Sequence, residues 1–307
     1  SCRNIHSNKI FQLVSNIVLL EEKIARGFLP VELQVNDNIT KDLYQRILAR
    51  HGKRQVRVIV DRAIYCSFLG SGFSELRRLS FSLFSWINSY ICSRGYLGKQ
   101  YPSTSIIYLD TFVSPDSISK AGTYTDRYYG GYEHYLTKND LQSIWRVPTL
   151  VGFRNPRDYR KFYSRLAQTN INFMIPDCFL EFSDFIYCLV QSFVIPKKIK
   201  KIPRFRGYDI GRFLRREIRG NLGATELISA LKTYRFVRRL AEKQVRIRKV
   251  IDWSENQIID RSLNVAIREC FPGIPIHGYQ GYVTGNNEVH KNPTSYEHSL
   301  GLVPDVL

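Results

Sequence analysis

The spacing of hydrophobic residues along the first part of the chain predicts helices and strands in alternation. Residues 10–29 are apolar at helical spacing with a charged opposite face, which is typical of an amphipathic helix. The β-branched run 55–60 predicts a short strand, and residues 72–98 predict a long helix. A second strand is predicted at 105–114, with Asp110 near its carboxyl end.

The same alternation continues to the end of the chain, after an aromatic loop at 123–136. The further predicted elements are a strand at 148–153, a helix at 155–170, a long basic helix at 221–249, a strand at 249–253, a helix at 254–271 and a strand at 273–283. Strands that alternate with helices favour an open parallel sheet with helices on both faces. The predicted fold class is therefore α/β, with a Rossmann-like parallel sheet and flanking helices.

Composition argues against a membrane-spanning protein and against a zinc or disulfide framework. No run of about 18 apolar residues occurs, and the two most apolar stretches, 81–93 and 177–195, are expected to be buried helices. The six cysteines form no C-x-x-C pair and have no histidines at ligand spacing beside them. Scattered thiols of this kind suit a reducing cytosol. The chain begins at Ser1 rather than at a methionine, which suggests a processed or partial chain.

The positive charge of the chain is concentrated in one segment. The 45 Lys and Arg exceed the 27 Asp and Glu by 18, and residues 196–249 alone hold 18 basic against 4 acidic residues, or +14. A solvated helix face, nucleic acid and the anionic cytoplasmic leaflet of a membrane are the three interpretations. Membrane docking is favoured, the solvated face comes second, and nucleic acid is third because no known nucleic-acid-binding motif occurs.

This charge distribution, together with the pattern of elements, predicts three parts. Residues 1–195 are expected to form an amino-terminal α/β lobe on the acceptor side. Residues 196–249 are expected to be a basic helical connector. Residues 250–307 are expected to begin a donor-binding, Rossmann-like lobe.

Two carboxylates stand where a predicted strand gives way to a helix. Asp252 and Glu255 fall at the carboxyl edge of the sheet, where α/β proteins bind their ligands. Either one suits a base, a nucleophile or a group that orients a sugar hydroxyl. The alternative is structural, because Ser254 is suited to cap the helix and acids in its first turn offset the helix dipole.

Two further polar groups follow towards the carboxyl end. His277 and Gln280 lie in H-G-Y-Q-G, where a strand runs into a Gly-x-x-Gly turn that lets a ligand approach the backbone. A structural role for the histidine is about equally weighted. Glu297 and His298 lie in 292–306, where a carboxylate suits a ribose diol and the histidine suits a phosphate; a plain helix start is the alternative.

Two other carboxylates are candidates in less defined settings. Glu133 belongs to the tyrosine-rich loop 123–136, which suits either a sugar platform or ordinary aromatic packing. Asp209 stands between two glycines in a basic region, where it is a candidate catalytic group or an ion-pair partner of Arg206 or Arg212.

The carboxyl-terminal motifs, taken in order, resemble a known family. The run reads D-W-S-E-N-Q, F-P-G-x-x-x-H-G-Y-Q-G, P-T-x-Y-E and G-x-x-P-D. It is similar to bacterial surface-carbohydrate biosynthesis proteins of the two-lobed GT-B glycosyltransferase type, and looks closest to O-antigen and capsule transferases that use CMP-linked, Kdo-like sugars. The resemblance covers residues 248–307, and more loosely 105–220, where LDTF, YYGGYEHYL and FRGYDIGRFLRRE are similar in kind.

The resemblance implies the activity and the residues that carry it. The implied nucleotide-sugar contacts are His277, Tyr279, Gln280 and Glu297, to which the residue pattern adds His298. The implied catalytic carboxylates come from Asp209, Asp252, Glu255 or Glu133. No D-x-D signature occurs, so transfer is expected to need neither a metal nor a cofactor besides the nucleotide-sugar co-substrate.

The resemblance also implies a setting. The expected acceptor is a lipid-linked or growing surface polysaccharide, and the expected location is cytoplasmic, peripheral at the inner face of the cytoplasmic membrane. The chain departs from the GT-B pattern because no room for a complete second Rossmann lobe follows residue 304, so the chain alone is not assured of turnover. The alternative function is a non-catalytic basic α/β module that binds nucleic acid or anionic lipid.

Overall fold

The chain folds into two compact units, seen here in a computed structural model. The first unit comprises residues 1–78 and 192–224, and the second comprises 79–191 and 225–307. The structure describes residues 9–28, 31–35, 37–60, 67–97, 102–131, 137–198, 204–220, 225–281 and 293–307. Each unit contains its own hydrophobic core and its own parallel strands, and each is described by itself.

The first unit is small and mostly helical. Its elements are α1 (Lys9–Ala25), β1 (Glu32–Val35), α2 (Asn38–Arg50), β2 (Arg57–Val60), β5 (Arg204–Phe205), β6 (Tyr208–Asp209) and α8 (Gly211–Gly220). Strands β1 and β2 pair in parallel, and β5 and β6 form a short antiparallel pair. Apolar residues of α1 and α2 pack with β1, β2 and Phe213 of α8 to form the core.

The second unit is built on a four-stranded, all-parallel sheet. The strands are β3 (Ile106–Val113), β4 (Ile144–Leu150), β7 (Ile247–Trp253) and β8 (Ile276–Tyr279), in the order β4-β3-β7-β8. The last residues of the chain continue this sheet, because Val306 bridges His277 beside β8. Such a sheet confirms the predicted α/β class, with parallel sheets flanked by helices as in Rossmann-like folds.

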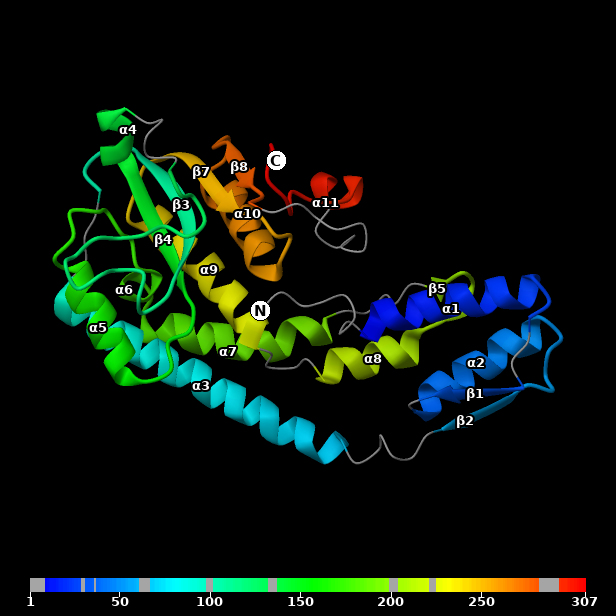
Figure 1. Cartoon of the computed structure of the whole chain (residues 1–307). Helices are drawn as coiled ribbons and strands as arrows, with labels where there is room; N and C mark the ends of the chain where they lie inside the picture. Colours follow the sequence, from blue (N-terminus) through cyan, green and yellow to red (C-terminus); the bar gives the residue numbers. More distant parts are fainter. Residues whose placement is uncertain are drawn as a thin grey trace. The chain divides into compact units, whose positions relative to one another are not determined.

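Helices of the second unit pack on this sheet (Figure 1). They are α5 (Pro156–Leu166), α6 (Pro176–Phe179), α9 (Thr225–Glu242) and α10 (Ile258–Cys270). The same unit contains two short helices, α4 (Lys138–Ser143) and α11 (Ser295–Ser299), which contribute no described residue to the core on this sheet. Two longer helices, α3 (Ser67–Tyr96) and α7 (Phe182–Lys197), each contribute residues to both units. None of the described helices is long and apolar enough to cross a membrane.

Side-chain alternation along the strands gives the sheet two different faces. Tyr108 and Val250 point into the large core, which α5, α6, α9 and α10 complete. Leu109 and Trp253 point to the opposite face, where Tyr129 of the aromatic loop packs on them. Among the described residues, helices therefore dominate the core on one face, and the tyrosine-rich loop supplies cover on the other.

Most predicted elements are present, with shifted ends. The strand predicted at 148–153 is β4, which begins earlier, at Ile144. The basic helix predicted at 221–249 ends at Glu242, because Gln244 takes a left-handed backbone (φ 56°) and the chain turns into β7. The predicted helix at 254–271 begins only at Ile258, so Ser254 does not cap it; Gln257 is the N-cap residue.

The division into units also differs from the predicted boundaries at 195 and 249. The basic segment 196–249 is split, with 196–224 in the first unit and 225–249 in the second. The physical reason lies in packing: α9 lies against α10, and its Phe236 and Val237 are fully buried in the core of the sheet. Helix α8 instead buries Phe213 against α1 and α2.

Candidate functional site

The order of the strands defines the edge at which a ligand site is expected. From β3 the chain crosses to β4 on one side, whereas β7 pairs with the other side of β3. Open α/β sheets bind ligands at the carboxyl ends of strands where the order reverses in this way. Residues that follow β3, β7 and β8 are therefore the first candidates for a site.

A buried acid cluster lies at this edge, under the start of α10. It consists of Asp110 on β3, Asp252 on β7 and Asp260 on α10, together with Asn264 one turn further along α10. All four side chains are buried. The Nδ2 group of Asn264 donates to Oδ2 of Asp252 at 3.1 Å and to the carbonyl of Asp260 at 2.7 Å. The hydrogen bonds of Asn264 therefore join the end of β7 to α10.

The aspartates of this cluster have raised pKa values because they are buried. Burial raises the pKa values of Asp110 and Asp252 well above the ordinary range, and repulsion from Asp260 adds to the effect. Two acceptor atoms, Asp252 Oδ1 and Asn264 Oδ1, have no hydrogen-bond partner among the described residues. A proton held by the cluster supplies a donor that ionised carboxylates lack. Burial and mutual repulsion therefore favour the protonated form of Asp110 and Asp252 more than they would in a solvent-exposed aspartate.

Asp260 has a separate structural duty at the start of α10. Its Oδ2 atom accepts the backbone N–H groups of Glu255 at 2.8 Å and Gln257 at 2.9 Å, which completes a capping box. Burial raises the pKa of Asp260 to about 6, although these two N–H groups oppose the shift. The side chain holds the loop between β7 and α10 in place.

Glu255 is the carboxylate of this loop that a ligand can reach. Its Oε1 atom accepts the indole N–H of Trp253 at 3.0 Å, and its Oε2 atom accepts the amide of Gln257 at 2.5 Å. The side chain of Glu255 is half-buried, whereas Asp252 has no exposed surface at all. Of the two predicted carboxylates in this motif, only Glu255 meets the geometric requirement for contact with a substrate.

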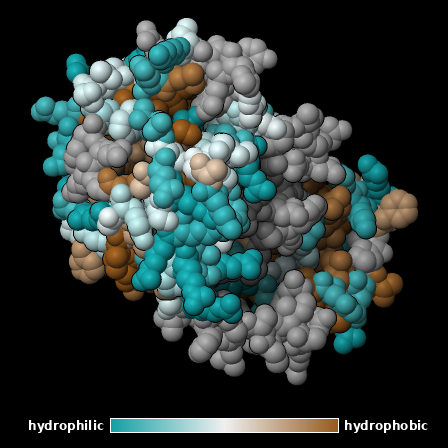
Figure 2. Space-filling view, turned by 60° about the vertical axis from the view of Figure 1, so that its left-hand side comes forward, coloured by the Kyte–Doolittle hydropathy of each residue, from teal (hydrophilic) through white to brown (hydrophobic). Residues whose placement is uncertain are grey.

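An aromatic cluster adjoins Glu255 on the other face of the sheet. It consists of Tyr128, Tyr129, Trp253 and Tyr279, whose ring centroids lie 4.3 to 5.8 Å apart in the contacting pairs. Trp253 is buried, and Tyr279 has 43% of its surface exposed. Figure 2 shows that hydrophobic and hydrophilic residues are interspersed on one face of the molecule. The cluster offers an aromatic surface beside a carboxylate.

Close packing explains the glycines of the H-G-Y-Q-G motif. A Cβ atom on Gly281 would lie 2.3 Å from the ring of Trp253, and one on Gly278 would lie 2.5 Å from Leu307 and 2.7 Å from Pro304. Space that was predicted to admit a ligand is therefore occupied by the chain itself. His277 on β8 is partly exposed, and Gln280 follows the strand with partial exposure.

Arg261 on α10 contacts the last predicted motif, at 292–306, through Glu297. It donates to Oδ1 of Asn256 at 3.1 Å and pairs with Glu297 at the start of α11. Glu297 also accepts the N–H of Thr294 at 2.8 Å in a capping box. Partial burial alone would raise the pKa of Glu297, but the Thr294 donors and the charge of Arg261 hold it below the ordinary value.

The remaining predicted residues are placed differently. His298 is an exposed residue of the short helix α11. Asp209 belongs to the first unit, where its Oδ1 atom accepts the N–H of Gly211 at 2.7 Å at the start of α8. Its expected partners pair elsewhere, Arg206 with Glu21 and Arg212 with Asp42. Glu133 lies outside the described residues.

The structure adds residues that the sequence pattern did not single out. Asp260 and Asn264 lie one helical turn apart on the buried side of α10, and Arg261 directly follows Asp260. An acid followed four residues later by an amide is ordinary in an amphipathic helix, so the spacing gave no separate signal. Gln257 was overlooked because the helix was expected to begin at Ser254.

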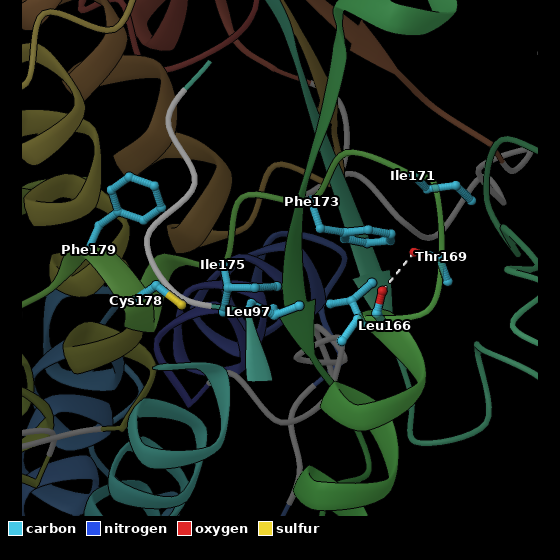
Figure 3. Close-up of a pocket in the computed structure, with 9 residues that line it drawn as sticks. Leu97, Leu166, Thr169, Ile171, Phe173, Ile175, Cys178 and Phe179 are labelled. Carbon is cyan, nitrogen blue, oxygen red and sulfur yellow. Dashed lines mark hydrogen bonds between the residues drawn. The ribbon is translucent and has the colours of Figure 1, made fainter. Parts of the chain in front are cut away.

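A small hollow lies away from this edge. It has a volume of about 60 Å³ and is lined by apolar side chains that include Leu97, Leu166 and Phe179 (Figure 3). Another lining residue, Phe173, bridges Arg146 near the amino end of β4. A nucleotide sugar does not fit in this volume. The described residues contain no group of three or more acids, histidines or cysteines arranged to hold a metal ion.

Comparison with known proteins gives no family for this chain. No family model matches it, and neither does any curated protein or solved structure. The geometry of the sheet edge therefore carries the functional argument, together with the motif resemblance.

Proposed function

We propose that this chain is a glycosyltransferase of GT-B type, which moves a sugar from a nucleotide-activated donor to a lipid-linked or growing surface polysaccharide. A CMP-linked, Kdo-like donor is favoured by the motif resemblance. The observation that carries the proposal is the position of Glu255: a reachable carboxylate at the switch point between β3 and β7, beside exposed Tyr279.

Glu255 is the proposed catalytic carboxylate. Its two oxygen atoms are fixed by Trp253 and Gln257, both of which are neutral donors. These two hydrogen bonds orient the carboxylate, and a base or a nucleophile needs a fixed position against its substrate. Asp252, buried beneath it, holds β7 to α10 through Asn264 and is proposed as a positioning residue.

Donor binding is assigned to the residues around Glu255. The exposed ring of Tyr279 suits stacking against a base or the C–H face of a sugar, with His277 on the same strand and Gln280 directly after it. Glu297 remains a candidate for the ribose diol, and His298 for a phosphate. The proposed transfer needs no metal, in line with the absence of a D-x-D signature from the sequence.

The proposed setting is the inner face of the cytoplasmic membrane, which an enzyme on a lipid-linked acceptor must reach. Part of the basic segment 196–249 is, however, occupied by internal ion pairs. Among its cations with carboxylate partners are Arg206, Arg212, Arg216, Lys232, Arg235, Arg239 and Arg248. These pairs reduce the charge available to any polyanion and weaken the alternative of a nucleic-acid-binding module.

Donor binding and donor cleavage test the proposal separately. A thermal-shift panel with CMP, UMP and GMP identifies the nucleotide, because a ligand that binds only the folded state raises its stability. Hydrolysis of CMP-, UDP- and GDP-sugars is then measured for the wild-type chain and for Glu255→Gln. We expect CMP to stabilise both proteins and the variant to lose donor hydrolysis by about a hundredfold or more, as loss of an acid–base group does.

Glu269→Gln is the matched control for this experiment. Glu269 is an exposed glutamate at the far end of α10, and it accepts the hydroxyl of Tyr234 at 2.6 Å. Its replacement removes one negative charge from the same helix and should leave hydrolysis unchanged. Absence of nucleotide binding and of hydrolysis with every donor contradicts the proposed function, whereas hydrolysis that survives Glu255→Gln contradicts only the assigned residue.

A further inference from the structure

Three exposed arginines gather where β4 ends and α5 begins. Arg154 lies in the turn that follows β4, and Arg157 and Arg160 lie three residues apart on α5. Residues three apart are neighbours on the surface of a helix. The turn is fixed to the helix, because the backbone N–H of Arg154 donates to Oδ2 of Asp158 at 2.9 Å. We call Arg154, Arg157 and Arg160 the α5 arginines.

The α5 arginines have no carboxylate partner among the residues that the structure describes. The next cation of the helix, Lys161, is different, because it pairs with Asp116 at 2.6 Å and so ties the loop after β3 to α5. The acid of the helix, Asp158, is half-buried and accepts the backbone N–H of Arg154. The positive charge of the α5 arginines is therefore not used by internal ion pairs.

Packing of the helix does not need this clustered charge. The side of α5 that holds it to the core carries Tyr159, Phe162 and Tyr163, which are fully buried. Like charges one helical turn apart destabilise a helix, so the exposed cations of α5 lower its stability. A bound oxyanion relieves this repulsion, and a guanidinium group offers paired N–H donors that match the oxygen atoms of a phosphate. The α5 arginines therefore fit a phosphate-bearing ligand.

The order of the strands places the α5 arginines at the same edge of the sheet as Glu255. The carboxyl ends of parallel strands meet at one edge, and only β3 separates β4 from β7. Two strand spacings amount to about 10 Å. Tyr279 belongs to β8, which pairs with the opposite side of β7. The α5 arginines therefore lie on the side of β7 that faces away from the residues assigned to the donor.

We propose that the α5 arginines bind a phosphate group of the acceptor, an inference that rests on the proposed function. The donor is assigned to residues of β7 and β8, so an anion bound at the end of β4 belongs to the second substrate. A glycan that is joined to lipid through a diphosphate carries such a group next to its sugars. The α5 arginines hold this group by charge and hydrogen bonds, while the sugar hydroxyl extends along the sheet edge towards Glu255.

Calorimetric titration of the full chain with inorganic pyrophosphate tests this inference. The double variant Arg157→Gln, Arg160→Gln removes two exposed cations and replaces them with residues that also favour helix. We expect its affinity for pyrophosphate to fall by about tenfold or more for each arginine, because hydrogen bonds between charged groups are the strong ones. Its affinity for CMP and its rate of donor hydrolysis should stay at the wild-type values.

The matched control is Arg238→Gln, Lys243→Gln, which removes two exposed cations from α9 and the turn after it. It should bind pyrophosphate as the wild-type chain does. Equal loss of affinity in the two double variants overturns the inference, because any exposed cations would then serve. A wild-type chain that does not bind pyrophosphate overturns it as well.

A titration with pyrophosphate in saturating CMP identifies the substrate that carries the phosphate. Independent binding supports the acceptor, whereas competition means that the α5 arginines hold the phosphate of the donor and overturns the assignment. The proposed function fails separately. If CMP binding and donor hydrolysis are both absent while Arg157→Gln, Arg160→Gln loses pyrophosphate, the anion site stands without the transferase. If donors are hydrolysed and that variant binds pyrophosphate normally, the function stands and this inference is wrong.

Discussion

Two aspartates of the second unit have the same burial and pKa values that are shifted in opposite directions. Asp184 at the start of α7 and Asp252 at the end of β7 each have no exposed side-chain surface. The pKa of Asp184 is below its usual value, whereas that of Asp252 is well above it. Burial alone therefore does not decide in which direction the pKa of a buried carboxyl group shifts in this protein.

The partners of the two side chains explain the difference. Burial tends to raise the pKa of Asp184, but hydrogen bonds from Arg239 at 2.9 Å, from the Glu181 N–H at 2.9 Å and from Arg235 outweigh it. Asp252 instead receives the neutral amide of Asn264 and lies near other acids. Cations at contact distance lower the pKa of Asp184, whereas burial and nearby acids raise the pKa of Asp252.

Replacement of the ionised aspartate should have the largest effect on stability. Asp184→Asn leaves Arg235 and Arg239, which are only 16% and 18% exposed, without their shared counter-charge. Breaking a buried ion pair by removing one partner costs about 3–5 kcal/mol. Chemical denaturation followed by tryptophan fluorescence measures this, because Trp86, Trp145 and Trp253 all belong to the second unit.

An exposed ion pair of the same unit supplies the control. Asp116 is 79% exposed and pairs with Lys161 at 2.6 Å. Asp116→Asn should leave the tryptophan-detected transition unchanged, because solvent screens such pairs. If Asp184→Asn is as mild as Asp116→Asn, the assignment of Asp184 as an ionised group that holds α7 to α9 is wrong.

Replacement of Asp252, whose pKa is raised, should have a smaller effect on stability, and that effect should depend on pH. Between the unfolded pKa of Asp252, near 3.8, and its raised folded value, the folded state keeps a proton that the unfolded state loses. Stability therefore falls as pH rises through this window, by about 1.4 kcal/mol per pH unit for one proton. Asp252→Asn cannot titrate, so its stability relative to the wild-type chain should increase as pH rises above about 4.

The sign of this change is the decisive result. Denaturation curves at pH 4, 5, 6 and 7 are compared for the two proteins, with Asp184→Asn as the reference of opposite sign: the ion-paired Asp184 contributes stability that is lost as pH falls, since its folded pKa is lowered. An Asp252→Asn variant that becomes steadily less stable than wild type with rising pH means that Asp252 is ionised and paired.

Sequence patterns located the edge of the sheet but not the partners of its acids. The strand at 249–253 and the helix after it were predictable from local periodicity, so Asp252 and Glu255 were correctly expected at a strand end. The contrast between Asp184 and Asp252 was not predictable, because Arg235 and Arg239 lie 51 and 55 residues beyond Asp184 in the chain. Only tertiary packing brings those charges together.

Local signals also failed where short elements depend on packing. Strand β1 has only four residues and becomes a strand through its parallel pairing with β2, which lies beyond α2. The Gly-x-x-Gly turn was expected to admit a ligand, but Trp253 fills the space at Gly281. A glycine signals close approach without stating what approaches. The function of the edge consequently stays a proposal, whereas its fold class was predictable.

The smallest expected effect concerns the third acid of the comparison, Glu255. It resembles Asp252 in having neutral donors, Trp253 and Gln257, and differs in being only half-buried. In Glu255→Gln the amide oxygen still accepts one of the two hydrogen bonds, but the NH2 group cannot accept the other. The loss of one hydrogen bond lowers the free energy of unfolding by no more than about 1 kcal/mol where water reaches the site. Tryptophan-detected denaturation at neutral pH should therefore barely change. A loss as large as that of Asp184→Asn would mean that Glu255 belongs to the buried framework. Near-native stability combined with lost donor hydrolysis assigns the carboxylate to chemistry. If Glu255 served only to stabilise the fold, the variant would lose hydrolysis only as far as it lost stability.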